Sequence, residues 1–319
     1  MLWAITSYFN SSGYKSRLKN YRSFRANLKV PLIAVELSFT GRFELEAGDA
    51  EVLVQLVGGD ILWQKERLLN LALCHLPGDC DEVAWIDCDV IFERDDWPKR
   101  ACAALRRFSI VQLFDERLNL APRAGHDSSR WMAVDSVATK TIGYLIATGQ
   151  FKPPDLYGTG PFVVRGLTCG LGWVARRALL EKHGLYDAKI LGGGDKAIVG
   201  AALAGGMLEY VNAAGLNAYQ TEHYLKWAAP FSQEIDGRIG FVDGRIFHLW
   251  HGDLNARKYR QRQETLTRFR FDPFTDIAVD RDSGCWRWNT NKPEMHERVK
   301  EYFRSRNEDW LPNGETLPT

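Results

Sequence analysis

Short apolar runs alternate with amphipathic stretches along the first 115 residues of the chain. A run of roughly four to eight apolar residues is typical of a strand buried on both faces, and apolar residues at helical spacing indicate a helix packed on one side. The pattern predicts strands at 2–9, 32–39, 51–59, 83–86 and 109–114. It predicts helices at about 15–28, 61–76 and 97–106, the second with Asp60 as its N-cap.

The pattern changes after residue 115. Proline and glycine are frequent between 115 and 165, which predicts loops with one helix. Further elements are then expected in chain order: a strand running into a helix at 167–184, an Ala-rich helix within 191–206, a strand at 207–211, a strand or turn at 245–252 and a basic helix at 255–270. The remaining tail is expected to wrap the surface.

Strands that alternate with helices are typical of a Rossmann-like α/β fold, in which a mostly parallel central sheet with right-handed crossovers is flanked by helices. The first predicted strand is not followed by Gly-x-Gly-x-x-Gly, and the chain has no Walker A loop. Dinucleotide binding and P-loop chemistry therefore lose their main sequence support.

The bulk composition is that of an ordinary globular protein of 319 residues with a formal net charge of +1. A charge so near zero argues against general electrostatic capture of nucleic acid or of an anionic membrane. Six scattered cysteines without a Cys-x-x-Cys pair favour reduced thiols in an intracellular protein. No segment has the ~20 apolar residues of a spanning helix, and the N-terminus lacks the pattern of a secretory signal, so we expect a cytoplasmic protein.

The apolar run Val83–Ile86 stops abruptly at Asp87-Cys88-Asp89. In open α/β sheets, ligands bind beyond the carboxyl ends of the strands, which is where these two carboxylates would lie. An unpaired carboxylate taken out of water costs several kcal/mol, and a divalent cation such as Mg²⁺ or Mn²⁺ would compensate that cost. The alternative is a strand that ends in a polar turn, because Asp-x-Asp alone is a common sequence.

Four motifs in order resemble a glycosyltransferase of the GT-A fold, and the pattern is most similar to that of the β-1,4-galactosyltransferases. The matching segments are Trp63-Gln64-Lys65 before Leu68-Leu69-Asn70, then Asp87-Cys88-Asp89, Gly192-Gly193-Gly194-Asp195, and finally His248 with His251. The third segment departs from the family's Gly-Gly-Glu-Asp, because glycine replaces the glutamate. The resemblance covers roughly residues 1–260.

The resemblance implies a metal site built from Asp89, His248 and His251, with Asp87 holding the ribose or supporting the ion. Imidazole ligands favour Mn²⁺, with Mg²⁺ as the alternative ion. Either histidine could instead be an ordinary packed side chain.

The resemblance also implies the contacts of a nucleotide-sugar donor. Lys65, with Gln64 before it, would meet the diphosphate at the start of a helix, where the helix dipole favours anions. Ser7 and Tyr8 would hold the nucleoside at the end of the first strand, Tyr8 by stacking, and Glu36 would bind it by hydrogen bonding. The alternatives are a solvated helix charge for Lys65 and a strand-edge residue for Glu36.

Asp195 is the candidate general base. It would lie at the mouth of a cleft on a glycine turn, which lets an acceptor approach. Its carboxylate can take the proton from the attacking hydroxyl, and attack in line with the departing diphosphate would invert the anomeric centre. The alternative is an N-cap for a helix that starts at Lys196, and the two roles are compatible.

These patterns together predict a metal-dependent glycosyltransferase. The donor would be a nucleotide sugar, UDP-linked, and the acceptor hydroxyl would belong to a glycan, a small molecule, a protein or a modified nucleic-acid base. A GT-A catalytic domain would span 1–260, with a nucleotide-sugar half at about 1–115 and an acceptor half at about 116–260, and 261–319 would be a C-terminal extension. The competing hypotheses are a nucleotidyltransferase and a non-catalytic sugar- or nucleic-acid-binding protein on a transferase fold.

Overall fold

The structure is a computed structural model that describes residues 1–120, 138–151, 168–252 and 261–310. Strands and helices alternate in its first part: β1 (Leu2–Phe9), α1 (Lys15–Asn27), β2 (Leu32–Ser38), β3 (Val52–Val57), α2 (Lys65–Leu73), β4 (Glu82–Ile86), β5 (Val90–Phe92), α3 (Trp97–Ala104) and β6 (Ile110–Gln112). A single 3-10 turn, Ala47–Asp49, precedes β3.

Among the described residues that follow β6, more residues lie in helices than in strands. The elements are β7 (Glu116–Asn119), β8 (Thr139–Lys140), α4 (Ile142–Ala147), β9 (Gly172–Arg176), α6 (Arg177–His183), α7 (Gly194–Ala202), α8 (Gly206–Ala214), α9 (Ala218–Ile235), β10 (Ile239–Phe241), β11 (Arg245–His248), α10 (Gln261–Arg268), β12 (Ile277–Val279), β13 (Trp286–Trp288) and α11 (Pro293–Arg304). Most of the stretch 115–165, predicted as loops with one helix, lies outside the described residues, as does the first part of the predicted basic helix.

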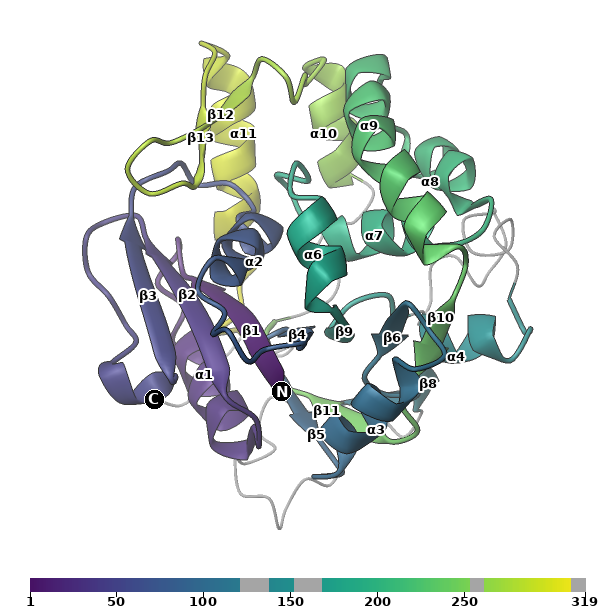
Figure 1. Cartoon of the computed structure of the whole chain (residues 1–319). Helices are drawn as coiled ribbons and strands as arrows, with labels where there is room; N and C mark the ends of the chain where they lie inside the picture. Colours follow the sequence, from purple (N-terminus) through teal and green to yellow (C-terminus); the bar gives the residue numbers. More distant parts are fainter. Residues whose placement is uncertain (121–137, 152–167, 253–260, 311–319) are drawn as a thin grey trace.

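A seven-stranded sheet in the order β10-β6-β9-β4-β1-β2-β3 forms the centre of the molecule (Figure 1). β1 pairs in parallel with β2 and β4, β2 pairs in parallel with β3, and β10 pairs in parallel with β6. Within this sheet, β9 runs antiparallel to both of its neighbours. The predicted α/β class, with a large and mostly parallel central sheet flanked by helices, is confirmed.

The central strands are buried on both faces because successive side chains enter two different apolar cores. Ile5 and Val83 face the core under α2, α6, α7 and α9, whereas Ala4 and Ala84 face the core under α1 and α3. Figure 1 shows the two sets of helices that cover these cores on opposite sides of the central strands. The continuous apolar runs in the sequence follow from this double coverage.

Two predictions about local structure are wrong. The run 207–211 is not a strand but lies within α8, whose ends are set by the left-handed residues Gly205 (φ 74) and Gly215 (φ 59). Asp60 does not cap α2, because that helix begins at Lys65 with Gln64 in the N-cap position. The Asp60 carboxylate instead accepts a hydrogen bond from the Trp288 amide at 2.7 Å.

The last described segment packs on the nucleotide-sugar half of the predicted domain. The ring of Phe303 in α11 stacks on Trp63 with centroids 6.4 Å apart. The buried side chain of Gln64 binds the backbone of β13, where Oε1 accepts from the Trp286 amide at 2.9 Å and Nε2 donates to the Trp286 carbonyl at 2.7 Å. Residues 286–303 are therefore integral to the fold around α2.

In the part of the chain that the structure describes, no helix combines the length and the apolar composition that crossing a membrane requires.

Replacing Gln64 by alanine should destabilise the fold. The side chain is fully buried, so its removal takes away the acceptor of the Trp286 amide and one of the donors to the Trp286 carbonyl, at a cost of about 1–3 kcal/mol. Chemical denaturation would measure the change, with Gln233→Ala on the exposed side of α9 as the control. Equal destabilisation of the two variants would contradict the structural role of Gln64.

Candidate active site

Strand register brings distant residues together in a smaller sheet, β5-β11-β7-β8. β5 begins directly after Asp89, and its antiparallel pairing with β11 aligns His248 with Val90. The Leu249 amide donates to the Asp89 carbonyl at 2.8 Å, which fixes the two segments at that point. β7 pairs in parallel with β11 and aligns Asn119 with His248. Asp89, His248 and Asn119 are neighbours because of these pairings.

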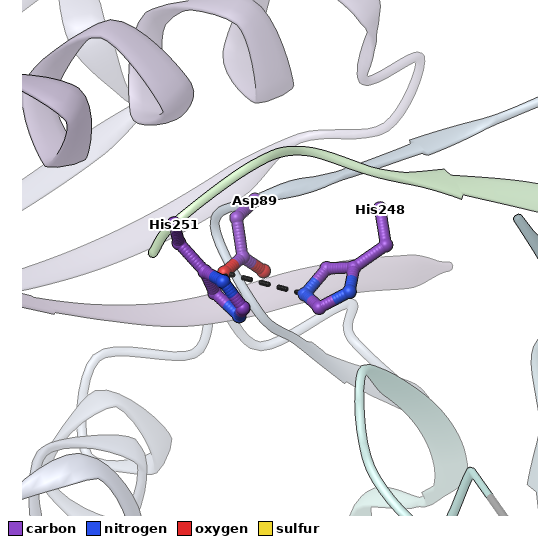
Figure 2. A group of neighbouring side chains, drawn as sticks. All are labelled: Asp89, His248 and His251. Carbon is purple, nitrogen blue, oxygen red and sulfur yellow. Dashed lines mark ion pairs between the residues drawn. The ribbon is translucent and has the colours of Figure 1, made fainter. Parts of the chain in front are cut away.

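Asp89, His248 and His251 form a compact cluster (Figure 2). Asp89 Oδ2 lies 3.6 Å from His248 Nε2 and 3.7 Å from His251 Nε2. One potential ligand atom from each residue lies within 4.8 Å of the other two. The structure thus brings together the three residues that the sequence analysis proposed as metal ligands.

The cluster has the donor atoms that a divalent cation needs. Asp89 Oδ1 and His248 Nε2 are buried, and neither has a hydrogen-bond partner among the described residues. His248 Nδ1 lies 3.1 Å from Asn119 Oδ1, and in the tautomer that donates to this oxygen, Nε2 presents its lone pair to the cluster. A cation bound here would satisfy both buried atoms, so the residues fit a metal ion.

Lys65 is a buried ammonium that links two carboxylates. Its Nζ lies 2.6 Å from Asp87 Oδ1 and 3.0 Å from Asp195 Oδ2. Burial disfavours the charged amine, but Asp195 and Asp87 outweigh that effect and raise the pKa of Lys65 well above its usual range. Burial also raises the pKa of Asp87 to about 6, although Lys65 opposes that shift. Lys65 is not a solvated helix charge, and it joins the end of β4 to the start of α7.

Asp195 lies in the first turn of α7, after a turn through the left-handed residues Gly192 and Gly193. Gly193 is the N-cap of this helix, so the alternative in which Asp195 caps a helix starting at Lys196 is wrong. The carboxylate rests against Gly170, where a Cβ would come within 2.5 Å of Asp195 Oδ2. The side chain of Asp195 is 24% exposed, so an incoming molecule can reach it.

The sequence analysis missed Glu66, which is 1% exposed and has no hydrogen-bond partner for either carboxylate oxygen among the described residues. Its carboxylate occupies the space that a Cβ on Gly194 would need. Burial raises the pKa of Glu66 to about 8 against the opposing charge of Lys65, so the side chain is mainly a neutral acid at pH 7. The only sequence signal for this residue was the glycine at position 194, where the galactosyltransferase pattern has a glutamate.

The predicted nucleotide contacts have structural partners of their own in this structure. Tyr8 is 2% exposed and donates to Glu44, and Glu36 is 2% exposed and accepts from the Glu44 amide. Gln64 holds β13, while Ser7 is half-buried in β1. Contact of Tyr8 or Glu36 with a nucleoside would require these side chains to leave the core, and a role for all four in donor binding stays a prediction.

Comparisons with known proteins leave the family unassigned. No protein-family model matches the sequence, and no curated protein matches it. Among solved structures, S. aureus TarS 1–349 has 15% identity, covers 66% of this chain and 55% of its own, and has a TM-score of 0.31. TarS in complex with UDP has 13% identity over 72% of this chain and 70% of its own, with a TM-score of 0.32. The 4-diphosphocytidyl-2C-methyl-D-erythritol synthase of Anaerococcus prevotii has 11% identity over 76% and 87%, with a TM-score of 0.31.

This chain therefore spans about half the length of the first of these structures. Similarities with such low TM-scores carry no argument about function, so the functional proposal rests on the geometry of the site.

Glu66→Gln should make stability less dependent on pH. The carboxyl has a pKa of about 8 in the folded chain against an ordinary value of 4.5, so the unfolded chain releases the proton first as the pH rises. The folded state therefore loses stability between about pH 4.5 and pH 8, and glutamine, which does not ionise, removes that loss. Thermal unfolding from pH 4 to pH 9 would measure it, with the exposed Glu297→Gln as control. If the stability of Glu66→Gln and of the unaltered protein changes with pH in the same way, the raised pKa of Glu66 is refuted.

Proposed function

We propose that this protein is a metal-dependent glycosyltransferase of the GT-A type that transfers a sugar from a UDP-sugar to a hydroxyl acceptor, with inversion. The main support is the cluster of Asp89, His248 and His251 next to the pair of Asp87 and Asp195 that Lys65 links. The side chains that would bind an ion and the carboxylate that would act as a base both belong to the region at the end of the buried strand β4, and open α/β sheets bind ligands at such ends. Displacement at an anomeric carbon would use both, because a metal ion stabilises the leaving diphosphate and a base takes the proton of the attacking hydroxyl.

Asp89, His248 and His251 would hold the ion, and Asn119 would orient His248 through its Nδ1 atom. When bound, a divalent ion neutralises the charge that develops on a departing diphosphate. Two imidazoles in the ligand set favour Mn²⁺ over Mg²⁺, which prefers oxygen ligands and keeps its waters.

Asp195 would accept the proton of the attacking hydroxyl. Its carboxylate is bound to Lys65, which also binds Asp87. A diphosphate that approaches the ammonium would compete with Asp195 for the same N–H donors, since phosphate oxygens are strong acceptors. Donor binding would thus release Asp195 to act as a base, which couples activation of the acceptor to the presence of the donor.

Asp89→Asn should weaken Mn²⁺-dependent binding of UDP by about 100-fold or more while the fold stays intact, because the variant loses a charged ligand. Calorimetry with UDP in Mn²⁺ and in EDTA would measure this loss. Asp282→Asn, on an exposed turn, is the matched control. UDP affinity of the unaltered protein that is equally high in EDTA would exclude the metal site.

Asp195→Asn should bind UDP-sugar and Mn²⁺ at least as tightly as the unaltered protein, because the carboxylate that competes with the diphosphate for Lys65 is lost. It should nevertheless transfer sugar about 10²–10⁴-fold more slowly, because a general base acts mainly in the transition state. Donor affinity, transfer rate and the anomeric configuration of the product by NMR would be measured together. Near-normal transfer by the variant, or a product that retains the configuration of the donor, would exclude Asp195 as the base of an inverting reaction.

A further inference from the structure

We propose that the junction of β1 and α1, together with Arg306, forms a binding site for a diphosphate group, and that Glu308 and Asp309 occupy this site as an internal substitute when no ligand is bound. Naming the ligand as the diphosphate of a nucleotide sugar rests on the proposed function. The anion site itself rests only on the contacts described below.

Glu308 is held by two arginines. Arg17 Nε donates to Glu308 Oε2 at 2.7 Å and Arg17 Nη2 donates to Glu308 Oε1 at 3.0 Å, while Arg306 Nε donates to Oε1 at 2.6 Å. The side chain of Glu308 is only 1% exposed. A planar fork of guanidinium donors around one anion is the arrangement that also binds phosphate groups.

Both guanidinium groups are positioned by contacts that do not involve Glu308. Arg17 Nη1 donates to the Phe9 carbonyl at 2.6 Å, at the carboxyl end of β1. The Arg306 guanidinium lies 4.9 Å from the ring centroid of Trp63, and its Nη1 donates to the Tyr302 hydroxyl at 3.2 Å. The arginine pair would therefore keep its place if the carboxylate left, as an anion site requires.

Asp309 occupies a second anion-binding feature of the same junction. Helix α1 has no capping side chain of its own. Its first two amides, on Lys15 and Ser16, donate to the Asp309 carboxylate at 2.9 Å each. A helix N-terminus attracts anions because its amides lack intrahelical acceptors. The carboxylate of Glu308 is thus bound by the arginine pair, and the carboxylate of Asp309 is bound by the first amides of α1. The two phosphates of a diphosphate would bind these two groups of donors in the same way.

The site lies next to the cluster of Asp89, His248 and His251. A Cβ on Gly252, the residue after His251, would come within 3.0 Å of both the Arg306 carbonyl oxygen and Glu308 Cα. Asn20 of α1 donates to the Trp250 carbonyl at 2.8 Å, which ties the same loop to the junction. A diphosphate that replaced the two carboxylates would therefore be close to the candidate metal ligands.

The charges at the junction match those of a diphosphate. The guanidinium groups of Arg17 and Arg306 face Glu308, and Asp309 lies on the adjacent amides of α1, so the two carboxylates balance the two arginines. A diphosphate would replace two negative charges with two, and its additional acceptor oxygens can use the guanidinium donors more fully. The segment that holds Glu308 is also outside regular structure, since α11 ends at Arg304 and Asn307 adopts a left-handed conformation (φ 48).

The test compares pyrophosphate binding, measured by calorimetry in EDTA, in the unaltered protein and in the double variant Glu308→Gln, Asp309→Asn. The variant should bind pyrophosphate on the order of tenfold more tightly, because the internal competitor is removed. The matched control is Glu297→Gln with Glu301→Gln, which makes the same charge change on exposed ion pairs of α11. Equal or weaker binding by the double variant would overturn the proposal, as would equal tightening by the control.

Two further measurements keep the proposal testable if the double variant folds poorly. Glu308→Gln alone should also bind pyrophosphate more tightly, and adding Arg306→Gln to it should reverse this increase in affinity. An increase in pyrophosphate affinity that persists in the Arg306→Gln, Glu308→Gln variant would count against a role for the arginine pair. In the unaltered protein, pyrophosphate should speed hydrogen exchange at the amides of Asn307 and Trp310, which donate to the Tyr14 hydroxyl and the Asn307 carbonyl. If pyrophosphate binds and hydrogen exchange at these two amides is unchanged, the proposal that it displaces Glu308 and Asp309 is refuted. Because EDTA removes metal, these results do not depend on whether Asp89 supports metal-dependent transfer.

Discussion

The buried ammonium of Lys65 is the charge on which the candidate site depends. Removing an ammonium from water is costly unless anions compensate it, and two nearby carboxylates repel each other unless a cation lies between them. Lys65 meets both needs by binding Asp87 and Asp195, which come from the end of β4 and the start of α7. Without this side chain, the carboxylates of Asp87 and Asp195 would repel each other at the edge of the sheet. The ion pairs that connect α2 with the end of β4 and the start of α7 would also be lost.

Two other charged clusters differ in what the chain itself provides. Asp89 and His248 each have a buried acceptor atom without a hydrogen-bond partner among the described residues, and a metal ion would supply that partner. Arg17 and Arg306, in contrast, are already bound by Glu308. A diphosphate there would have to replace the internal carboxylates, because the guanidinium groups would otherwise be uncompensated.

The sequence predicted the central strands well because burial on both faces leaves an uninterrupted apolar run, as in Val83–Ile86. It also proposed Asp89, His248 and His251 as a group, and the structure places them together, although the strand pairings that do so were not predictable from local patterns. The run 207–211 failed as a strand because five apolar-rich residues suit a short helix between two glycines equally well. The position of Glu66 depends on an absent side chain at Gly194, and such complementarity between distant positions leaves almost no trace in a single sequence.

The contacts of the last described segment determine when the site can form during synthesis. Residues near the start of the chain, from Tyr14 to Gln64, are bonded to partners between Trp286 and Asp309. A nascent chain that has released only its first half from the ribosome exposes the arginine at the β1–α1 junction without its carboxylate and α2 without its β13 partner. Residues 14–64 therefore gain these partners only after residues 286–309 have been synthesised, and an incompletely packed edge of this kind can bind other chains until then.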